Sequence, residues 1–170
     1  MRLLASLGPP LTVFALALLA ALPWGLPSDG RFFLPLLPFV AIHYWALRHA
    51  ERMPEWVVFL AGLTLDVLTN GPLGYWALIY LLGYIIAVLQ APWGQDGVLW
   101  RALLFLAALA VLAVAEWGLS SLYYFEWADW RPFAWAALAA GLVYPVFAAV
   151  LRSLDPEHGR PRNVTFERGR

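Results

Sequence analysis

Two carboxyl groups and one imidazole lie deep inside long apolar stretches of this 170-residue chain: Asp66, Glu116 and His43. Two carboxyl groups could act as an acid–base pair or a proton relay, and Ser120 follows Glu116 on the same segment. The chain has no cysteine, which excludes a thiol nucleophile and thiolate metal ligands. Its three histidines show no spacing typical of a metal site. Enzyme chemistry is therefore the weakest interpretation of these residues, because no nucleophile or metal motif accompanies them.

The composition indicates which solvent surrounds these groups. Hydrophobic residues make up 62% of the chain and charged residues 13%, whereas soluble domains average roughly 45–50% and about 25%. A soluble chain of this length cannot bury so much apolar surface, so the excess must face lipid. The sequence predicts an integral membrane protein of one domain. A charged side chain at mid-membrane costs about 2.5–3.5 kcal/mol, so each polar residue there needs a reason.

Six apolar segments are candidates for transmembrane helices, which need roughly 17–25 residues. They cover residues 10–26, 32–47, 55–69, 72–91, 99–124 and 132–151. Polar stretches containing Pro, Gly, Arg or Asp separate most of them. The NGPLG connection is so short that the third and fourth segments must form an antiparallel hairpin. The predicted fold is an all-α membrane protein, a bundle of about six transmembrane helices.

The distribution of arginine predicts the orientation of the bundle. With the N-terminus in the cytoplasm, nine arginines fall inside, whereas only Arg31 and Arg131 fall outside. This asymmetry places both termini in the cytoplasm. Residues 1–152 then form the transmembrane domain, and residues 153–170 form a basic cytoplasmic tail that we expect to be disordered. Alternatively, Arg2, the apolar run after it and the Ala20–Ala21 pair form a cleavable signal peptide, which arginine counting does not exclude.

Asp66 shares a helix face with Gly62 and Asn70, because residues four apart lie above one another. A stripe of small and polar residues favours contact with other helices, since lipid offers a carboxyl group no partner. Two interpretations of Asp66 remain open. It caps the first turn of the fourth helix by accepting backbone N–H groups, or it binds a ligand or a partner protein.

The other buried polar residues have more general interpretations. Glu116, with Ser120 on its face, lines a polar cleft or is protonated and hydrogen-bonded between helices. His43 lies in an aromatic segment, where a lone histidine is most often a hydrogen-bonded packing residue. Ala137 and Gly141 predict tight packing of the sixth segment against a helix of this chain or of another. Pro145 predicts a kink about one turn before it.

The order of these pieces resembles the MreD family of bacterial rod-shape-determining proteins. The first matching piece is the aromatic span and its Arg- and Pro-containing turn, FLPLLPFVAIHYWALRHAERMPEW. The second is FLAGLTLDVLTNGPLGYWALIYLLGY, which carries the pattern G-L-x-x-D-x-x-x-x-x-x-L-G. The resemblance is specific over residues 35–84. Elsewhere it depends on length, the number of spans and the basic tail.

The resemblance implies a non-enzymatic component of the cell-elongation machinery in the bacterial inner membrane, without a cofactor or a bound nucleic acid. The implied partners are membrane lipid and the bitopic protein MreC, and through MreC the MreB filament and the RodA–PBP2 peptidoglycan synthase. The resemblance also assigns positions that bind a partner or shape the hairpin. Together with the turn residues between them, these positions are Gly62, Asp66, Asn70, Gly71, Pro72, Leu73 and Gly74. Asp66, Glu116 and Ser120 would line a polar groove at the outer mouth of the bundle.

Two other functions compete with this interpretation. The family is similar, at the level of the fold, to the substrate-capture subunits of energy-coupling transporters, which implies a small-molecule pocket open to the outside. A membrane-embedded hydrolase that uses Asp66 and Glu116 is the third possibility, and Ser120 on the helix of Glu116 is its weak support.

Overall fold

The protein is described by a computed structural model in which residues 2–25, 32–94 and 97–155 are placed. This part of the chain contains six α-helices and no strand. Two short 3-10 helices flank the second α-helix, η2 (Leu34–Leu36) before it and η3 (Ala50–Arg52) after it. The α-helices are α1 (Arg2–Ala21), α2 (Leu37–His49), α3 (Glu55–Thr69), α4 (Tyr75–Gln90), α5 (Val98–Tyr124) and α6 (Arg131–Leu154). The predicted all-α fold with six helices is confirmed.

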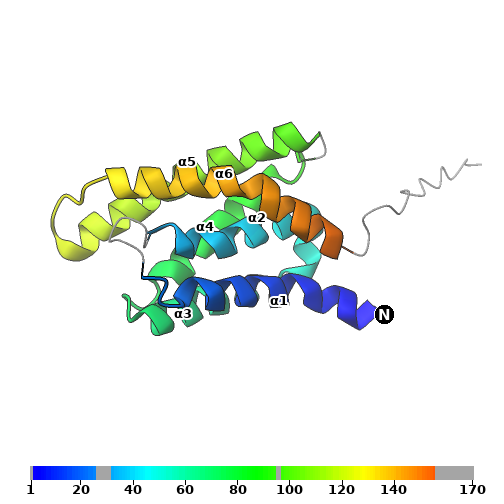
Figure 1. The fold of residues 1–170 in the computed structure, drawn as a ribbon, viewed down its shortest axis with the longest axis horizontal. Helices are drawn as coiled ribbons and strands as arrows, with labels where there is room; N and C mark the ends of the chain where they lie inside the picture. Colours follow the sequence, from blue (N-terminus) through cyan, green and yellow to red (C-terminus); the bar gives the residue numbers. More distant parts are fainter. Residues whose placement is uncertain (1, 26–31, 95–96, 156–170) are drawn as a thin grey trace, which may run out of the picture.

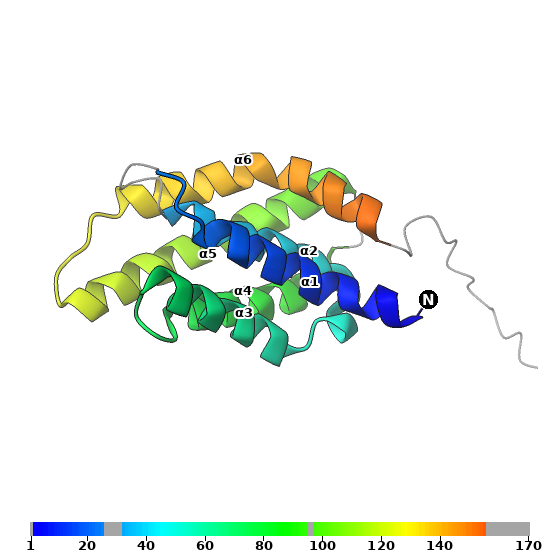
Figure 2. The same ribbon diagram turned by 60° about the horizontal axis from the view of Figure 1, so that its bottom comes forward.

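Helix α2 lies in the centre of the bundle and contacts α1, α4 and α6 (Figure 1). Every residue from Leu37 to Leu47 is buried. A helix that is apolar on all sides must be covered on all sides, and here the covering is protein. The core of the molecule is therefore built around α2, with the α3–α4 hairpin on one side and the α5–α6 pair on another (Figure 2).

Helices α5 and α6 have a different environment. They contain 27 and 24 residues, which correspond to roughly 40 and 36 Å at 1.5 Å per residue, more than a hydrocarbon core of about 30 Å. Only 28% and 22% of their most apolar windows are buried within the protein. By length and composition these two of the described helices could cross a membrane, whereas α4 and the apolar part of α1 are shorter. The apolar outer faces of α5 and α6 are not covered by other helices of the bundle.

Several predicted boundaries were wrong. The first helix begins at Arg2 and not at residue 10, because Pro9 and Pro10 lie within it and do not stop it, and it ends at Ala21 rather than at residue 26. The second begins with the 3-10 turn η2, where Pro35 falls at the start. The fourth begins at Tyr75 rather than Pro72, because Gly74 has a φ of 92° that a helix cannot include.

The sixth helix continues to Leu154, past the predicted end at residue 151. Its direction changes in its second half, where Pro145 lies (Figure 1). A Cβ added at Gly141 would lie 2.6 Å from Cδ2 of Leu106, so the small residues of α6 pack closely against α5 of the same chain. The predicted disordered tail lies outside the described residues from residue 156 onward.

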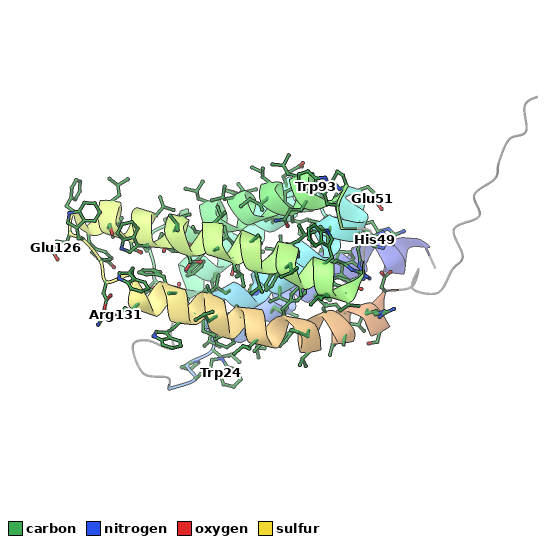
Figure 3. All side chains as sticks on the ribbon, turned by 90° about the horizontal axis from the view of Figure 1, so that it is seen from above. Trp24, His49, Glu51, Trp93, Glu126 and Arg131 are labelled. Carbon is green, nitrogen blue, oxygen red and sulfur yellow. The ribbon has the colours of Figure 1, made fainter. Side chains whose placement is uncertain are left out.

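The two ends of the bundle differ in their polar residues. We call the end with the α3–α4 turn (residues 70–74) and the α5–α6 loop (residues 125–130) the hairpin end, and the opposite end the arginine end. Glu126 and Arg131 lie at the hairpin end, whereas His49, Glu51 and Trp93 lie at the arginine end (Figure 3). The arginines of the arginine end whose side chains the structure describes are Arg48, Arg52, Arg101 and Arg152.

Candidate functional site

The α3–α4 turn is fixed by backbone conformations that few residues adopt. Asn70 ends α3 with a φ of 53°, in the left-handed region that asparagine tolerates better than most residues. The N–H of Gly71 donates to the carbonyl of Asp66 at 3.0 Å. Gly74 has a φ of 92°, and a Cβ added there would meet nothing within 4 Å. Glycine is needed at position 74 for its backbone conformation and not for space.

The carboxyl group of Asp66 holds the first turn of α4. Its Oδ2 accepts the N–H of Gly74 at 2.8 Å, and its Oδ1 accepts the N–H of Trp76 at 2.9 Å. The Asp66 side chain is 0% exposed. Of the two interpretations of this residue, the structure has the capping geometry, in which both oxygens satisfy N–H groups that a helix start leaves free. The carboxyl group also lies at the positive end of the α4 dipole.

Gly62, one turn before Asp66, permits the close approach that this cap requires. A Cβ added at Gly62 would lie 2.7 Å from the carbonyl carbon of Trp76. Because the obstructing atoms belong to the backbone of α4, no side-chain movement could relieve the overlap. The predicted contact of Gly62 and Asp66 with a neighbouring helix is thus observed, and the neighbour is α4. Asn70 is exposed and does not belong to this contact, because the helix ends before it.

Glu116 is buried in a different way. Its side chain is 0% exposed, and within the described part of the chain neither carboxyl oxygen has a hydrogen-bond partner. The Tyr75 hydroxyl donates to the backbone carbonyl of Glu116 at 3.1 Å and lies 3.1 Å from Oγ of Ser120. The expected interhelical hydrogen bond of the Glu116 carboxyl is therefore not formed. Since Asp66 and Glu116 are both fully buried, neither lines an open groove.

This arrangement does not assemble catalytic machinery. The Asp66 oxygens are occupied by backbone amides, and Ser120 is hydrogen-bonded to Tyr75 rather than to a base. No group of three His, Asp or Glu residues that could hold a metal ion occurs among the described residues. The geometry of Asp66 and its turn is that of a structural device.

A second polar contact, which the sequence did not reveal, joins the core helices. His43 Nε2 lies 3.0 Å from Oε1 of Gln90, and Nε2 of Gln90 donates to the carbonyl of Leu104 at 3.1 Å. Because the carbonyl can only accept, the amide of Gln90 must present its oxygen to His43, and His43 Nε2 must carry the proton. Rings of Phe105 and Tyr144 surround the imidazole. His43 is a hydrogen-bonded packing residue, as expected, but its partner could not be named from sequence.

The outer surface of the hairpin is apolar. Leu73, in the turn, is 75% exposed, and Val67 and Leu68, near the end of α3, are 59% and 45% exposed. We call these three residues the hairpin surface. The α5–α6 loop extends beyond the turn at the same end of the molecule (Figure 2), and it carries Phe125 and Trp127, which are 90% and 86% exposed. The hairpin end thus presents large apolar side chains on and beside a turn that is hydrogen-bonded to Asp66.

The sequence model of one protein family, rod shape-determining protein MreD, matches residues 2–154. The chain belongs to the MreD family. The match covers all six helices and confirms the resemblance first seen in residues 35–84. Membership supports a rod-shape-determining role for the chain, as a membrane-associated structural component. No curated protein and no solved structure matches the chain, so the expected likeness to transporter capture subunits has no support.

Proposed function

We propose that this MreD-family protein is a multi-pass component of the bacterial inner membrane that binds MreC at its hairpin end. Through MreC it would organise peptidoglycan synthesis by the RodA–PBP2 synthase along MreB filaments. The proposal combines the family membership with one observation, the exposed apolar surface on the turn that Asp66 caps. The proposed role is non-enzymatic, because the Asp66 oxygens accept backbone N–H groups and Ser120 is hydrogen-bonded to Tyr75 rather than to a base.

The membrane setting is supported by the apolar surface. Large apolar side chains with more than half of their area exposed occur along both long helices, such as Leu142 at 81% and Val114 at 65%. Water-soluble monomers rarely expose apolar patches that extend along two long helices. In a lipid bilayer the exposure of this surface carries no hydrophobic free-energy penalty. The two long helices are also long enough to span the hydrocarbon core.

The orientation follows from the charges of the two ends. Among the described residues, the arginine end carries four arginines and the hairpin end carries Arg131. This bias supports an orientation with the arginine end in the cytoplasm. The native chain has no cysteine, so single cysteines can report the topology directly. We expect Glu126→Cys, in the exposed α5–α6 loop of the hairpin end, to react with a membrane-impermeant maleimide in cells whose outer membrane is permeabilised. Leu99→Cys should react only after the inner membrane is opened. The reverse pattern would contradict the proposed orientation.

The hairpin surface has the properties of a docking site for a transmembrane or extended segment. Its backbone is preorganised by the Asp66 hydrogen bonds, so binding does not have to order the turn. Leu73 and Val67 offer apolar area on α3 and its turn, on the side away from the core. A bitopic partner such as MreC could lay its membrane segment against this side and its periplasmic start against the turn.

The deciding experiment measures co-purification of MreC with matched variants. Leu73→Ser removes an apolar side chain that is 75% exposed at the hairpin end, and Leu99→Ser removes one that is 76% exposed near the arginine end. We expect Leu73→Ser to weaken the complex by about tenfold, whereas Leu99→Ser should leave it intact. Both variants should keep the fold, because neither side chain is buried.

A second variant tests the turn rather than its surface. Gly74→Leu forces a β-carbon onto a backbone with a φ of 92°, which costs roughly 1–2 kcal/mol. We expect loss of the complex and loss of rod shape in cells that carry this variant as their only copy. If MreC co-purified equally with wild type, Leu73→Ser and Gly74→Leu, the hairpin end would not be its binding site.

A further inference from the structure

A cavity of about 110 Å³ opens at the arginine end between α2, α5 and α6. One arginine from each helix lines it: Arg48 from α2, Arg101 from α5 and Arg152 from α6. Tyr44 and Tyr144 belong to the same lining. We call this cavity the arginine pocket. The arginine pocket lies at the opposite end of the bundle from the hairpin surface, and the proposed binding of MreC does not involve it.

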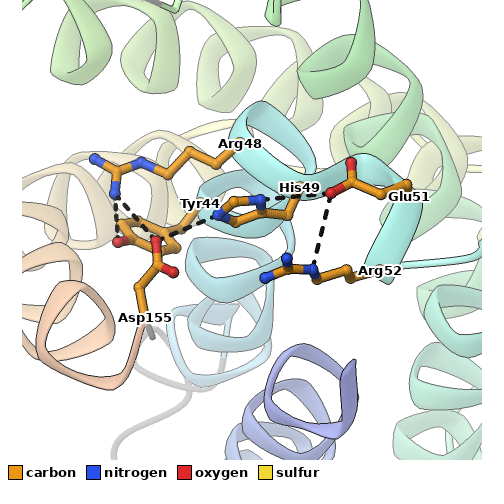
Figure 4. A network of polar contacts seen from close by, with 6 residues as sticks. All are labelled: Tyr44, Arg48, His49, Glu51, Arg52 and Asp155. Atoms are coloured by element: carbon orange, nitrogen blue, oxygen red, sulfur yellow. Dashed lines mark hydrogen bonds and ion pairs between the residues drawn. The ribbon is translucent and has the colours of Figure 1, made fainter. Parts of the chain in front are cut away.

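The charged residues that line the arginine pocket are arginines. No carboxylate is among the described residues that line it. The carboxyl group of Asp155 contacts two basic side chains near the pocket: its Oδ2 lies 3.8 Å from Nη1 of Arg48 and 3.4 Å from Nε2 of His49 (Figure 4). Arg101 donates from Nε to the carbonyl of Gly97 at 3.2 Å. Three guanidinium groups around one cavity favour a bound anion there over a cation.

Arg48 is held in place for such a role. Its Nη1 donates to the hydroxyl of Tyr44 at 2.6 Å, and its guanidinium carbon lies 4.4 Å from the centre of the Tyr44 ring (Figure 4). A guanidinium that is already stacked and hydrogen-bonded loses little freedom when it binds a ligand. Its side chain is 19% exposed, so water competes only partly with an anion.

The remaining walls are apolar and consist of small residues. Ala102 of α5 faces Ala148 and Ala149 of α6, and Pro145 closes the wall toward the middle of the bundle. The surface of the cavity is mostly apolar, and the apolar windows of α5 and α6, two of the helices that line it, are mostly not buried. The cavity has room for several water molecules, and therefore for one phosphate group, but not for a peptide segment. A longer apolar ligand would have to leave it along the α5–α6 surface.

We propose that the arginine pocket binds the phosphate group of an anionic phospholipid, with one acyl chain lying along the α5–α6 surface. Guanidinium groups bind phosphate oxygens through two parallel hydrogen bonds, and basic pockets between helices at the cytoplasmic face are typical sites for anionic headgroups. The proposal depends on the membrane setting of the proposed function, but not on the binding of MreC. The site would tie the cytoplasmic ends of α2, α5 and α6 to one lipid molecule.

Native mass spectrometry of the detergent-purified chain tests the site by titration with three probes. Dioleoyl-phosphatidylglycerol carries the charge and the acyl chains, dioleoyl-phosphatidylcholine carries the chains without net charge, and glycerol phosphate carries the anion alone. We expect one phosphatidylglycerol to bind at least about tenfold more tightly than either of the other probes. Arg101→Gln should weaken its binding by about tenfold or more, the loss expected for a charged hydrogen-bonded pair.

Two matched variants separate a built site from diffuse attraction. Arg101→Lys keeps the charge but not the planar fork, so a built site loses part of its affinity, whereas diffuse attraction is unchanged. Arg131→Gln removes an arginine at the hairpin end and should have no effect. Equal binding of the two lipids, equal losses in Arg101→Gln and Arg131→Gln, or tight binding of glycerol phosphate would each overturn the proposal. The MreC co-purification assay is independent of these measurements, so either hypothesis can fail alone.

Discussion

Replacement of Asp66 by alanine should destabilise the protein more than removal of any exposed cap. The substitution leaves the N–H groups of Gly74 and Trp76 without their carboxylate acceptor. An unsatisfied buried donor costs about 1–3 kcal/mol, so the two amides together could cost about 2–6 kcal/mol. Gly74 is only partly buried, so its amide should lose less than that of Trp76, which is buried. We therefore expect a loss of about 3–4 kcal/mol in the free energy of unfolding.

Asp66→Asn should cost about half as much. The amide oxygen can still accept one N–H group, but the amide nitrogen then faces the second one as another donor. Asp129 provides a matched control, because its Oδ1 accepts the N–H of Arg131 at 3.1 Å at the exposed start of α6. Its replacement by alanine should cost only about 0.5–1 kcal/mol, and its replacement by asparagine should cost little, because asparagine caps a helix start about as well as aspartate.

Unfolding in mixed micelles, followed by the fluorescence of the ten tryptophans, measures these differences. Hydrogen exchange adds a local readout, since the amides of Gly74 and Trp76 should exchange faster in Asp66→Ala while those of α6 keep their rates. A loss below about 1 kcal/mol, or one no larger than that of Asp129→Ala, would refute the capping argument. Unchanged exchange at both amides would refute it as well.

Three further substitutions test the packing around the hairpin and the core, with the same unfolding assay. Gly62→Ala should cost about 1–3 kcal/mol, because its Cβ would overlap the backbone at Ala77, and a neutral effect would mean that α3 and α4 can separate freely. Glu116→Leu should raise the free energy of unfolding by about 1–2 kcal/mol, because it removes two buried oxygens that have no partner among the described residues; destabilisation would show that the carboxyl group is satisfied. Gln90→Leu should cost about 2 kcal/mol, because it leaves the Nε2–H group of His43 unpaired. Adding His43→Leu to this variant should recover part of the loss. If the losses of the two substitutions were additive instead, the two residues would not be coupled.

The separation of the partners along the chain decides which contacts could be predicted. The bounds predicted for the third helix, residues 55–69, are those of α3, because Pro54 and the Asn-Gly pair mark its ends. The capping role of Asp66 could also be predicted from the sequence. The two N–H groups that its carboxyl group accepts belong to residues only eight and ten positions later, across one turn. The contact of His43 with Gln90 spans 47 residues. No local sequence pattern could predict this pair, because the contact depends on how α2 and α4 cross.

The central position of α2 was also hidden from the sequence. Its apolar residues show no periodic face, which is typical both of a helix in lipid and of one buried in protein. The structure distinguishes the two cases: α2 is covered on every side, whereas α5, which is more apolar, is mostly uncovered. Three arginines from three helices likewise converge on one pocket, although they are far apart in the sequence. Helix packing and not composition brings them together.

The lengths of the helices explain why the hairpin needs a carboxylate. Helices α3 and α4 contain 15 and 16 residues, or roughly 22–24 Å, whereas a hydrocarbon core is about 30 Å thick. If the arginine end lies at the cytoplasmic headgroups, the turn at residues 70–74 reaches only into the outer part of the hydrocarbon region, and the α5–α6 loop extends beyond it (Figure 2). Water is scarce at that depth, so free N–H groups must be satisfied by the protein itself. Asp66 meets this demand at Gly74 and Trp76, which allows an apolar turn such as that of Leu73 to lie below the membrane surface, where the membrane segment of a partner can reach it.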